Sequence, residues 1–359
     1  MTFEDPRMEF LSAMAAALSR FGETADSLES GLQACARTLG VEVAFFSVPT
    51  AVLVAYGHGA AMHTVLLHTR DSAIDLEALS LLHETLLDIT RGRKSAAQGL
   101  AEVRLITASP PRFPRYMRVL ASGLGAAAIS VFLGGGVREL TAAIPVGVAV
   151  GALSVIARRT ERLTSLVELL AGFLAAVLTL ALGHVLPHFH PATVALAGLI
   201  LLLPGLTITL GVSELAARHL VSGSARLAGA TVSLVSLGLG VAVGYAIFTK
   251  LGWVPPVGPG REIPGQWLTV MAVVASLLLG LGSNLYARLT SRPAAVPLVP
   301  GLAALVPGAL GFRGISAFLR SATGSLEILA AVLVIAAGLV VGLLVADATL
   351  PTRRAPFRG

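Results

Sequence analysis

Two apolar segments of the chain place proline beside glycine, and this pattern could create a binding site for a polar solute. The first segment is LLLPGLTITL, residues 201–210, and the second is VPLVPGLAALVPGAL, residues 296–310. Proline removes a backbone donor and glycine relaxes the chain, so both segments predict interrupted helices. The N–H and C=O groups freed at a break can bind a polar solute inside a membrane. The candidate binding residues are Pro204, Gly205, Thr207, Thr209, Pro300, Gly301, Pro307 and Gly308.

Charged side chains near the ends of the apolar runs are the second set of candidates. Glu168, Glu214, Arg218 and Arg226 could couple or gate the movement of a solute, because a carboxylate beside a low-dielectric surface can titrate near neutral pH. Glu214 and Arg218 are also spaced for an ion pair along one helix, which is a purely structural alternative. The hydroxyls of Ser233 and Ser236 have a similar alternative in helix packing.

Long apolar helices must position these residues. From about Tyr116 to Thr349 the chain is almost continuously apolar, and only 13% of all its residues are charged, against about 25% in soluble domains. Runs of this length predict membrane-spanning helices rather than barrel strands. We therefore expect a polytopic α-helical membrane protein with broken helices. About eight spans are predicted, at 116–133, 140–157, 165–186, 192–210, 225–249, 267–287, 294–310 and 326–349.

Arginine lies mainly in alternate loops, and this sets the expected orientation. Basic clusters at 157–162, 214–219, 287–292 and 352–359 fall on one side if both termini are cytoplasmic. The net charge of +6 is thus explained by loop charges, and no nucleic-acid partner is expected. Whether the segment 294–321, with Arg313 and Arg320, is a full span or re-entrant stays open. We divide the membrane region into a first module, 116–249, and a second, shorter one, 250–359.

Residues 1–112 read as a small cytoplasmic α+β domain. Helical periodicity covers 8–21, 24–39, 75–91 and 95–106, and β-prone runs cover 41–48, 51–56 and 62–68. Several polar residues of this domain could suggest a membrane-anchored hydrolase as an alternative, although no nucleophile motif frames them. Those residues are Ser47, Thr50, His58, His63, His68 and Asp71.

Metal and cofactor chemistry receives little support. His184, His188 and His190 surround Pro187, but neither a carboxylate nor a cysteine accompanies them. The lone Cys35 excludes a cysteine-based zinc site and an internal disulfide framework. The first ten residues contain no basic and apolar leader, so we expect no cleavable signal peptide. We predict no metal, no cofactor and no enzymatic activity.

Three segments in series resemble the bacterial threonine/serine exporter family. LLLPGLTITLGVSELAARHLVSGSARLAGA (201–230) is similar to the family's stretch of proline-glycine, acidic and basic residues, with Glu214 where aspartate is usual and Leu210 where asparagine is frequent. GETADSLESGLQACARTLGVEVAFFSVPTAV resembles its amino-terminal domain, and LYARLTSRPAAVPLVPGLAALVPGALGFRGI resembles its second module. By position, the motif's proline and glycine fall on Pro204 and Gly205, its acid on Glu214 and its base on Arg226.

This resemblance implies an exporter of threonine and serine in the cytoplasmic membrane, driven by protons and working by alternating access. Its partners would be the amino acid, protons and the lipid bilayer, with a homo-oligomer left open. Export of another small metabolite, such as a dicarboxylate, is a further alternative. The departures at Leu210 and Glu214 leave the substrate less defined than the fold.

Overall fold

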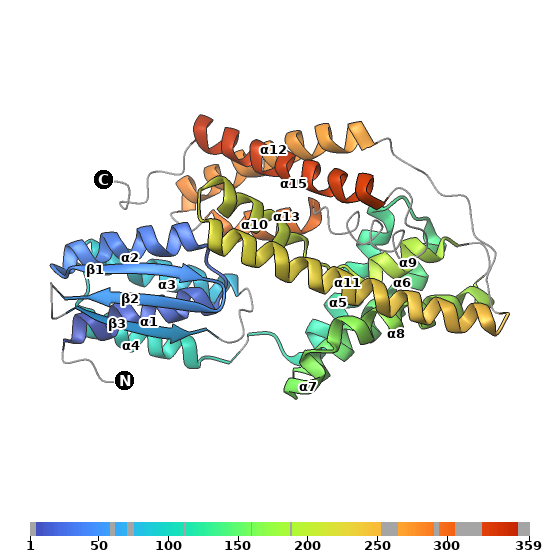
Figure 1. The fold of residues 1–359 in the computed structure, drawn as a ribbon, viewed down its shortest axis with the longest axis horizontal. Coiled ribbons are helices and arrows are strands. Elements are labelled where there is room, and N and C mark those ends of the chain that lie inside the picture. Colours follow the sequence, from blue (N-terminus) through green and yellow to red (C-terminus); the bar gives the residue numbers. More distant parts are fainter. Residues whose placement is uncertain are drawn as a thin grey trace.

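The computed structural model describes residues 5–57, 62–69, 75–110, 112–158, 160–186, 189–252, 265–290, 294–305 and 325–350. It contains an N-terminal unit of helices and strands at one end and an assembly of long helices at the other (Figure 1). His58, Asp71, His188, Pro307 and Gly308 lie outside the described residues.

The N-terminal unit consists of four helices and a three-stranded sheet. Helices α1 (Pro6–Arg20) and α2 (Ala25–Leu39) precede strands β1 (Val43–Val48), β2 (Ala51–Tyr56) and β3 (His63–His68). The strands pair antiparallel in the order β1-β2-β3, and helices α3 (Leu76–Thr90) and α4 (Ala96–Ala108) follow. These elements lie close to the ranges that periodicity predicts. Their apolar faces share one core, which includes Phe10, Leu28, Val52, Leu82 and Leu100.

Capping residues begin three of these four helices. Asp5 and Asp75 accept hydrogen bonds from the first backbone N–H groups of α1 and α3, and Ser95 forms a capping box with Gln98 at α4. Thr24, at the start of α2, makes no such bond with its side chain. The first backbone N–H groups of α2 therefore need another acceptor.

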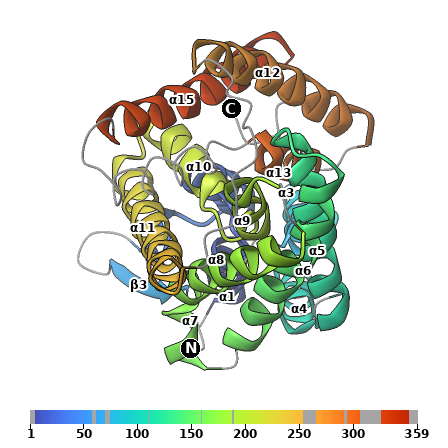
Figure 2. The ribbon, with the colours of Figure 1, turned by 90° about the vertical axis from the view of Figure 1, so that its right-hand side faces the viewer.

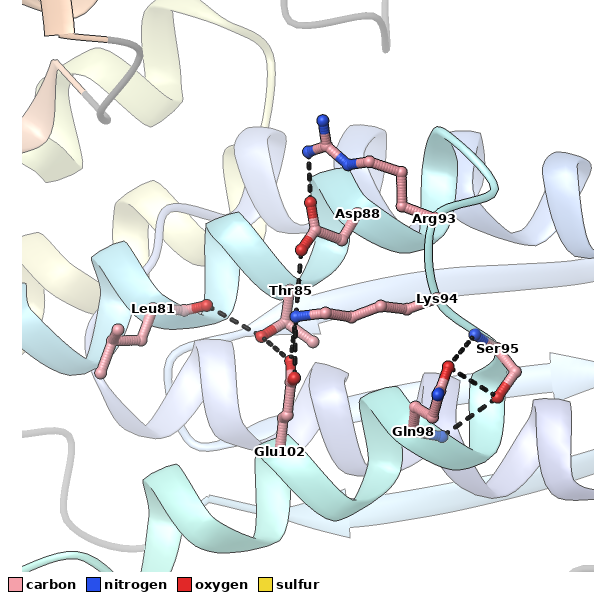
Figure 3. A network of polar contacts seen from close by, with 8 residues as sticks. All are labelled: Leu81, Thr85, Asp88, Arg93, Lys94, Ser95, Gln98 and Glu102. Atoms are coloured by element: carbon pink, nitrogen blue, oxygen red, sulfur yellow. Dashed lines mark hydrogen bonds and ion pairs between the residues drawn. The ribbon is translucent and has the colours of Figure 1, made fainter.

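An ion-pair network fixes the turn between α3 and α4 (Figure 3). Lys94 Nζ lies 3.0 Å from Asp88 Oδ2 and 2.7 Å from Glu102 Oε1, and Arg93 also pairs with Asp88. The hydrogen bond from Lys94 holds the pKa of the Asp88 carboxyl below its usual value. Thr85 Oγ1 donates to the carbonyl of Leu81 on the same helix. Arg93 is exposed and the other three charges are partly buried, so each keeps some contact with solvent and the individual ion pairs contribute only modestly to stability.

The remaining elements are nearly all long apolar helices. Four of them are long and apolar enough to cross a membrane among the described residues: Val137–Ala157, Val167–Val185, Leu220–Phe248 and Val270–Thr290. Gly205–Ala216 and Val334–Thr349 are shorter apolar stretches. The expected eight spans thus remain a prediction beyond these four. The helices are α5 (Arg115–Phe132), α6 (Val137–Ala157), α7 (Glu161–Thr164), α8 (Val167–Val185), α9 (Pro191–Leu199), α10 (Gly205–Ala216), α11 (Leu220–Lys250), α12 (Gly265–Thr290), α13 (Ala295–Leu305) and α15 (Ser325–Thr349).

Glycine lets α8 and α11 pack with their backbones in contact. A Cβ added to Gly172 would lie 2.2 Å from the Leu237 carbonyl oxygen, and one added to Gly240 would lie 2.1 Å from the Leu169 carbonyl oxygen. Small residues at helix contacts are the usual means of close packing in lipid, where apolar side chains gain little by leaving the solvent. The α8–α11 pair is therefore a tight scaffold for the first module.

We expect Gly240→Ala to destabilise this pair by about 1–3 kcal/mol, because the new methyl group must push one backbone away from the other. Thermal unfolding of the purified protein in detergent would measure the loss. Gly229→Ala, on the same helix, is the matched control, since its Cβ would meet nothing within 4 Å. Equal unfolding temperatures for the two variants would contradict the close-packing argument.

Candidate functional site

The chain is interrupted between α9 and α10, at the first proline-glycine pair. Helix α9 ends at Leu199, a turn follows, and α10 begins at Gly205 directly after Pro204. In Figure 2, α9 and α10 lie among the other helices of the assembly, and α10 contacts α11, α13 and α15. The predicted break is therefore confirmed at this position.

The break leaves polar backbone groups inside the helical assembly. The N–H groups of Gly205 and Ile208 donate to the carbonyls of Leu203 and Pro204, at 2.8 and 3.0 Å. Those of Leu206 and Thr207 have no backbone acceptor within the described part of the chain. The start of a helix carries a partial positive charge, so these two donors suit an anionic group such as a carboxylate.

The two threonines after the break differ in what they can offer. Thr209 is buried, and its hydroxyl donates to the carbonyl of Gly205 one turn earlier, at 3.1 Å. Thr207 is half-buried. Of the two predicted hydroxyls, that of Thr207 is the better placed for a ligand because the backbone already binds the other.

The second proline-glycine pair does not interrupt its helix. Helix α13 runs from Ala295 to Leu305 and includes Pro300 and Gly301, so the predicted break at that pair is wrong. Gly301 instead permits close approach of α12, since a Cβ there would lie 2.3 Å from Leu279 Cδ1. Pro300 is the sixth of the 11 residues of α13, so the helix continues despite the one backbone hydrogen bond that this proline cannot donate.

Glu214 is a buried carboxylate that accepts three hydrogen bonds. Its side chain, at the end of α10, is 2% exposed. One carboxylate oxygen accepts hydrogen bonds from Ser222 Oγ at 2.7 Å and Arg226 Nε at 3.0 Å, and the other accepts from the N–H of Ala25 at 3.3 Å. A buried carboxylate needs such partners to offset its lost hydration.

The turn between α10 and α11 brings these residues together. Arg218 adopts a left-handed conformation with φ 67°, which ends α10 in the way a glycine usually does. Gly211 and Gly223 let the two helices approach so closely that a Cβ on Gly223 would lie 2.7 Å from the Gly211 carbonyl oxygen. The partner of Glu214 is therefore Arg226 across the turn. The ion pair considered between Glu214 and Arg218 is not the one formed, because Arg218 is the turn residue.

The third partner of Glu214 belongs to the N-terminal unit. Ala25 is the first residue of α2, the helix that Thr24 leaves without a side-chain cap, so Glu214 provides that cap from 189 residues away. Arg226 Nη2 also donates to the carbonyl of Glu23, at 3.5 Å, and His219 Nε2 lies 3.5 Å from Asp26 Oδ1. The N-terminal unit thus docks onto the α10–α11 turn through the start of α2.

Other titratable groups of the N-terminal unit surround this junction. Burial raises the pKa of Glu29, and the nearby carboxylates of Asp26 and Glu214 raise it further. Burial alone would raise the pKa of Glu23 and lower that of His83, but their mutual contact reverses both shifts. The Glu23–His83 pair is therefore charged between these two pKa values, and its stabilising effect fades as pH rises through the raised pKa of His83.

Two further polar contacts join membrane helices. Ser233 Oγ on α11 donates to Glu168 Oε1 on α8, at 3.2 Å, so both of these sequence candidates meet. Asn284 Nδ2 on α12 donates to Asp347 Oδ1 at 2.7 Å and to the Leu350 carbonyl at 3.0 Å. Asn284 was missed in the sequence because a single amide in a long apolar run has no motif around it.

The hydrolase and metal candidates are not assembled in the described structure. Ser47 is buried, and its backbone N–H donates to Glu29 Oε1 at 2.7 Å. His63 and His68 lie at opposite ends of β3. Within the described residues no group of three histidine, cysteine or acidic side chains could hold a metal ion. His58 and Asp71, the other two titratable candidates for a hydrolase, lie outside the described residues.

Comparison with known proteins now decides the family. Residues 9–248 match the family described as "Putative threonine/serine exporter", and residues 264–349 match a second one described as "Threonine/Serine exporter, ThrE". The chain belongs to the threonine/serine exporter family. Together with the apolar helices, this membership makes the chain a multi-pass membrane protein.

Several fungal proteins are similar to this chain. An uncharacterized protein of Schizosaccharomyces pombe, C7D4.12c, is 27% identical over 69% of this chain and 33% of its own length. "Pheromone-regulated membrane protein 10" of Candida albicans is 27% identical over 77% of this chain and 26% of its own length, and that of Saccharomyces cerevisiae 26% identical over 69% and 32%. The chain thus spans about a third or less of the length of these relatives. No solved structure matches it.

We expect Glu214→Ala to loosen the start of α2, because the N–H of Ala25 loses its acceptor and Arg226 its buried partner. A lost helix cap is typically worth about 1 kcal/mol, which corresponds to roughly fivefold faster amide exchange. Hydrogen–deuterium exchange of the peptide that begins α2 would measure this change.

Glu168→Ala is the matched control, since it removes a carboxylate whose partner, Ser233, lies on α11 away from the N-terminal unit. Unchanged exchange at the start of α2 in Glu214→Ala would show that the contact does not hold the two parts together.

Proposed function

We propose that this protein exports a small hydroxy amino acid, such as threonine or serine, across the cytoplasmic membrane. The family membership supports membrane export, and the interruption at Pro204 supports the site. The single observation that carries the proposal is at the start of α10, where the N–H groups of Leu206 and Thr207 have no backbone acceptor among the described residues. Such donors can bind the carboxylate of an amino acid in place of its hydration shell.

Preference for a hydroxyl-bearing side chain is assigned to Thr207. Thr207 is half-buried beside these N–H groups. One solute could therefore bind the N–H groups through its carboxylate and the Thr207 hydroxyl through its own hydroxyl. The second half of the site would come from α13, which contacts α10 and carries Pro300 and Gly301, and from Pro307 and Gly308 beyond the described residues. Movement of α10 between two positions would expose this site to either side in turn.

Protons are the proposed coupling ion, and Glu214 is the proposed coupling group. A carboxylate that accepts hydrogen bonds from Ser222, Arg226 and Ala25 would release them on protonation. Arg226 would then lose its partner, while Arg218 would set the geometry of the turn. Glu168 would act in the same way on a smaller scale, through Ser233. Because Glu214 lies on α10, the helix that follows the break, loss of its hydrogen bonds would change the position of the helix that carries the solute site.

The arrangement in the membrane is also a proposal. We infer about eight spans in two modules, 116–249 and 250–359, with residues 1–112 as a cytoplasmic domain and both termini inside. The arginine-rich alternate loops support this orientation. The contact between α2 and the α10–α11 turn also supports this proposal, because it brings the N-terminal unit to the basic loop 214–219, which the proposed orientation assigns to the cytoplasmic side.

Counterflow of labelled serine in proteoliposomes, against a panel of amino acids and a dicarboxylate, would test the export activity. We expect Thr207→Val to weaken serine transport relative to alanine transport, because an unpaired substrate hydroxyl costs about 1–3 kcal/mol. Thr209→Val is the matched control, since that hydroxyl is already bonded to Gly205.

Equal losses for serine and alanine would remove the role of Thr207, and exchange of the dicarboxylate alone would replace the substrate. The same vesicles under an imposed pH gradient test the coupling. Glu214→Gln should retain counterflow and lose its response to the gradient.

Reporter fusions would test the orientation. A reporter after Gly359, or one inserted near Ser165, should give a cytoplasmic signal, and one near Gly258 an external signal. The physical reason is that arginine-rich loops are retained on the cytoplasmic side. An external signal at Gly359 or Ser165 would change the number of spans.

A further inference from the structure

The three-stranded sheet of the N-terminal unit exposes apolar side chains on one of its two faces. Helices α1 and α2 contact the strands, and on the face that they cover Val52 and Val54 are fully buried. On the opposite face the strand register pairs Phe46 with Leu53 and Leu53 with Leu66, so the three form one row across the sheet. Phe46 is 48% exposed and Leu66 is 49% exposed. Figure 1 shows the sheet from this face.

This exposed face, which we call the outer sheet face, carries no acidic residue, lysine or arginine. An antiparallel sheet with one face in water usually alternates buried apolar residues with exposed polar ones. Here the exposed set is mainly apolar as well, and an exposed apolar patch marks a surface that contacts another molecule. The positions of the outer sheet face are Ala44, Phe46, Val48, Ala51, Leu53, Ala55, Thr64, Leu66 and His68.

Helix α11 continues this surface toward the membrane helices. It contacts β1, and its packing against α8 and α10 leaves the opposite side of the helix exposed. That side includes Val232 and Val235, which are 66% and 45% exposed, and a Cβ added to Gly229 would meet nothing within 4 Å. Figure 2 shows β3 and α11 on the same side of the molecule. One partner can therefore contact both surfaces.

We propose that the outer sheet face packs against the same face of a second copy of this chain. The sheet lies beyond the helices that are long enough to cross a membrane, and its outer face points sideways from the long axis of the molecule, so the bilayer does not cover it (Figure 1). A partner must be apolar and uncharged over this area, because a buried charge would find no counterpart there. A second copy meets this condition, since the outer sheet face is complementary to itself.

The symmetry of this contact suits two copies in one membrane. The strands run along the long axis of the molecule, which leads from the N-terminal unit to the membrane helices (Figure 1). A two-fold axis in that direction stacks the two sheets with aligned strands and gives both copies the same orientation in the bilayer. Antiparallel pairing of two β3 edges would instead need a two-fold axis across the strands. That axis would insert the two copies in opposite directions.

The area of the contact requires α11 as well as the sheet. Three strands of six residues cover only roughly 280 Å², from the usual rise per residue and strand spacing. A stable interface buries about 800 Å² on each partner. The exposed side of α11 adds to the sheet, and Gly229 allows a second helix to approach closely there. The proposed interface thus consists of the outer sheet face and this side of α11.

Cysteine cross-linking of the full chain in its membrane tests the contact directly. Leu53 lies on the middle strand in the apolar row, so Leu53→Cys should place two thiols near the two-fold axis. Cys35→Ala first removes the only native cysteine. We expect a short bis-maleimide reagent to yield a covalent dimer, because packed sheets lie about 10 Å apart, which is too far for a direct disulfide. Leu105→Cys is the matched control, since Leu105 lies on α4 and is 69% exposed.

A charge placed on the outer sheet face should separate the two copies. Phe46→Glu brings like charges together in an apolar contact, so we expect it to weaken dimerisation at least about tenfold. Light scattering of the purified protein in detergent measures the mass. Leu105→Glu is the matched control and should leave the dimer intact.

A monomeric mass for the unmodified protein would overturn the inference, and so would a dimer that Phe46→Glu leaves unchanged. Cross-linking at Leu105→Cys as strong as at Leu53→Cys would also overturn it. Circular dichroism and thermal unfolding of Phe46→Glu separate a lost contact from a lost fold. The inference does not depend on which solute is transported, because none of these measurements uses a solute.

Discussion

A single buried carboxylate, Glu214, joins the neighbouring helices α10 and α11 to the start of α2, which lies 189 residues away in the sequence. In a low-dielectric surrounding an ionised carboxylate is costly unless several donors surround it. Here the donors come from α11, through Ser222 and Arg226, and from the start of α2, through Ala25. Satisfying this one charge therefore fixes both the α10–α11 turn and the place where the N-terminal unit docks.

Helix α10 connects this junction to the proposed solute site. It has 12 residues, with the Pro204 break before its first turn and Glu214 in its last. A short helix moves as a rigid body, so a displacement of the first turn of α10 also displaces its last turn. Any motion that opened the break would strain the cap on α2. The N-terminal unit is thus in direct contact with the turn that ends α10.

The two proline-glycine segments show how similar sequences serve different physical ends. At Pro204 the helix is interrupted, and the N–H groups of Leu206 and Thr207 have no backbone acceptor among the described residues. At Pro300 the helix continues, and Gly301 is used instead to bring α12 close. Glycine has the same effect between α8 and α11, where the absence of side chains at Gly172 and Gly240 lets the two backbones come into contact. In lipid such contacts carry the packing that a hydrophobic core provides in water.

The sequence by itself predicted a mostly helical membrane protein, the approximate bounds of the helices and strands within residues 5–108, and the break at Pro204, because these follow from local periodicity and composition. It also identified Glu214 and Arg226 as notable residues. Their pairing was decided only in three dimensions, since it depends on the left-handed turn at Arg218, a residue that gives no such signal. The uncapped start of α2 was a local hint, yet its acceptor lies 189 residues away. Local sequence does not encode such contacts between distant elements, so only the tertiary structure could show them.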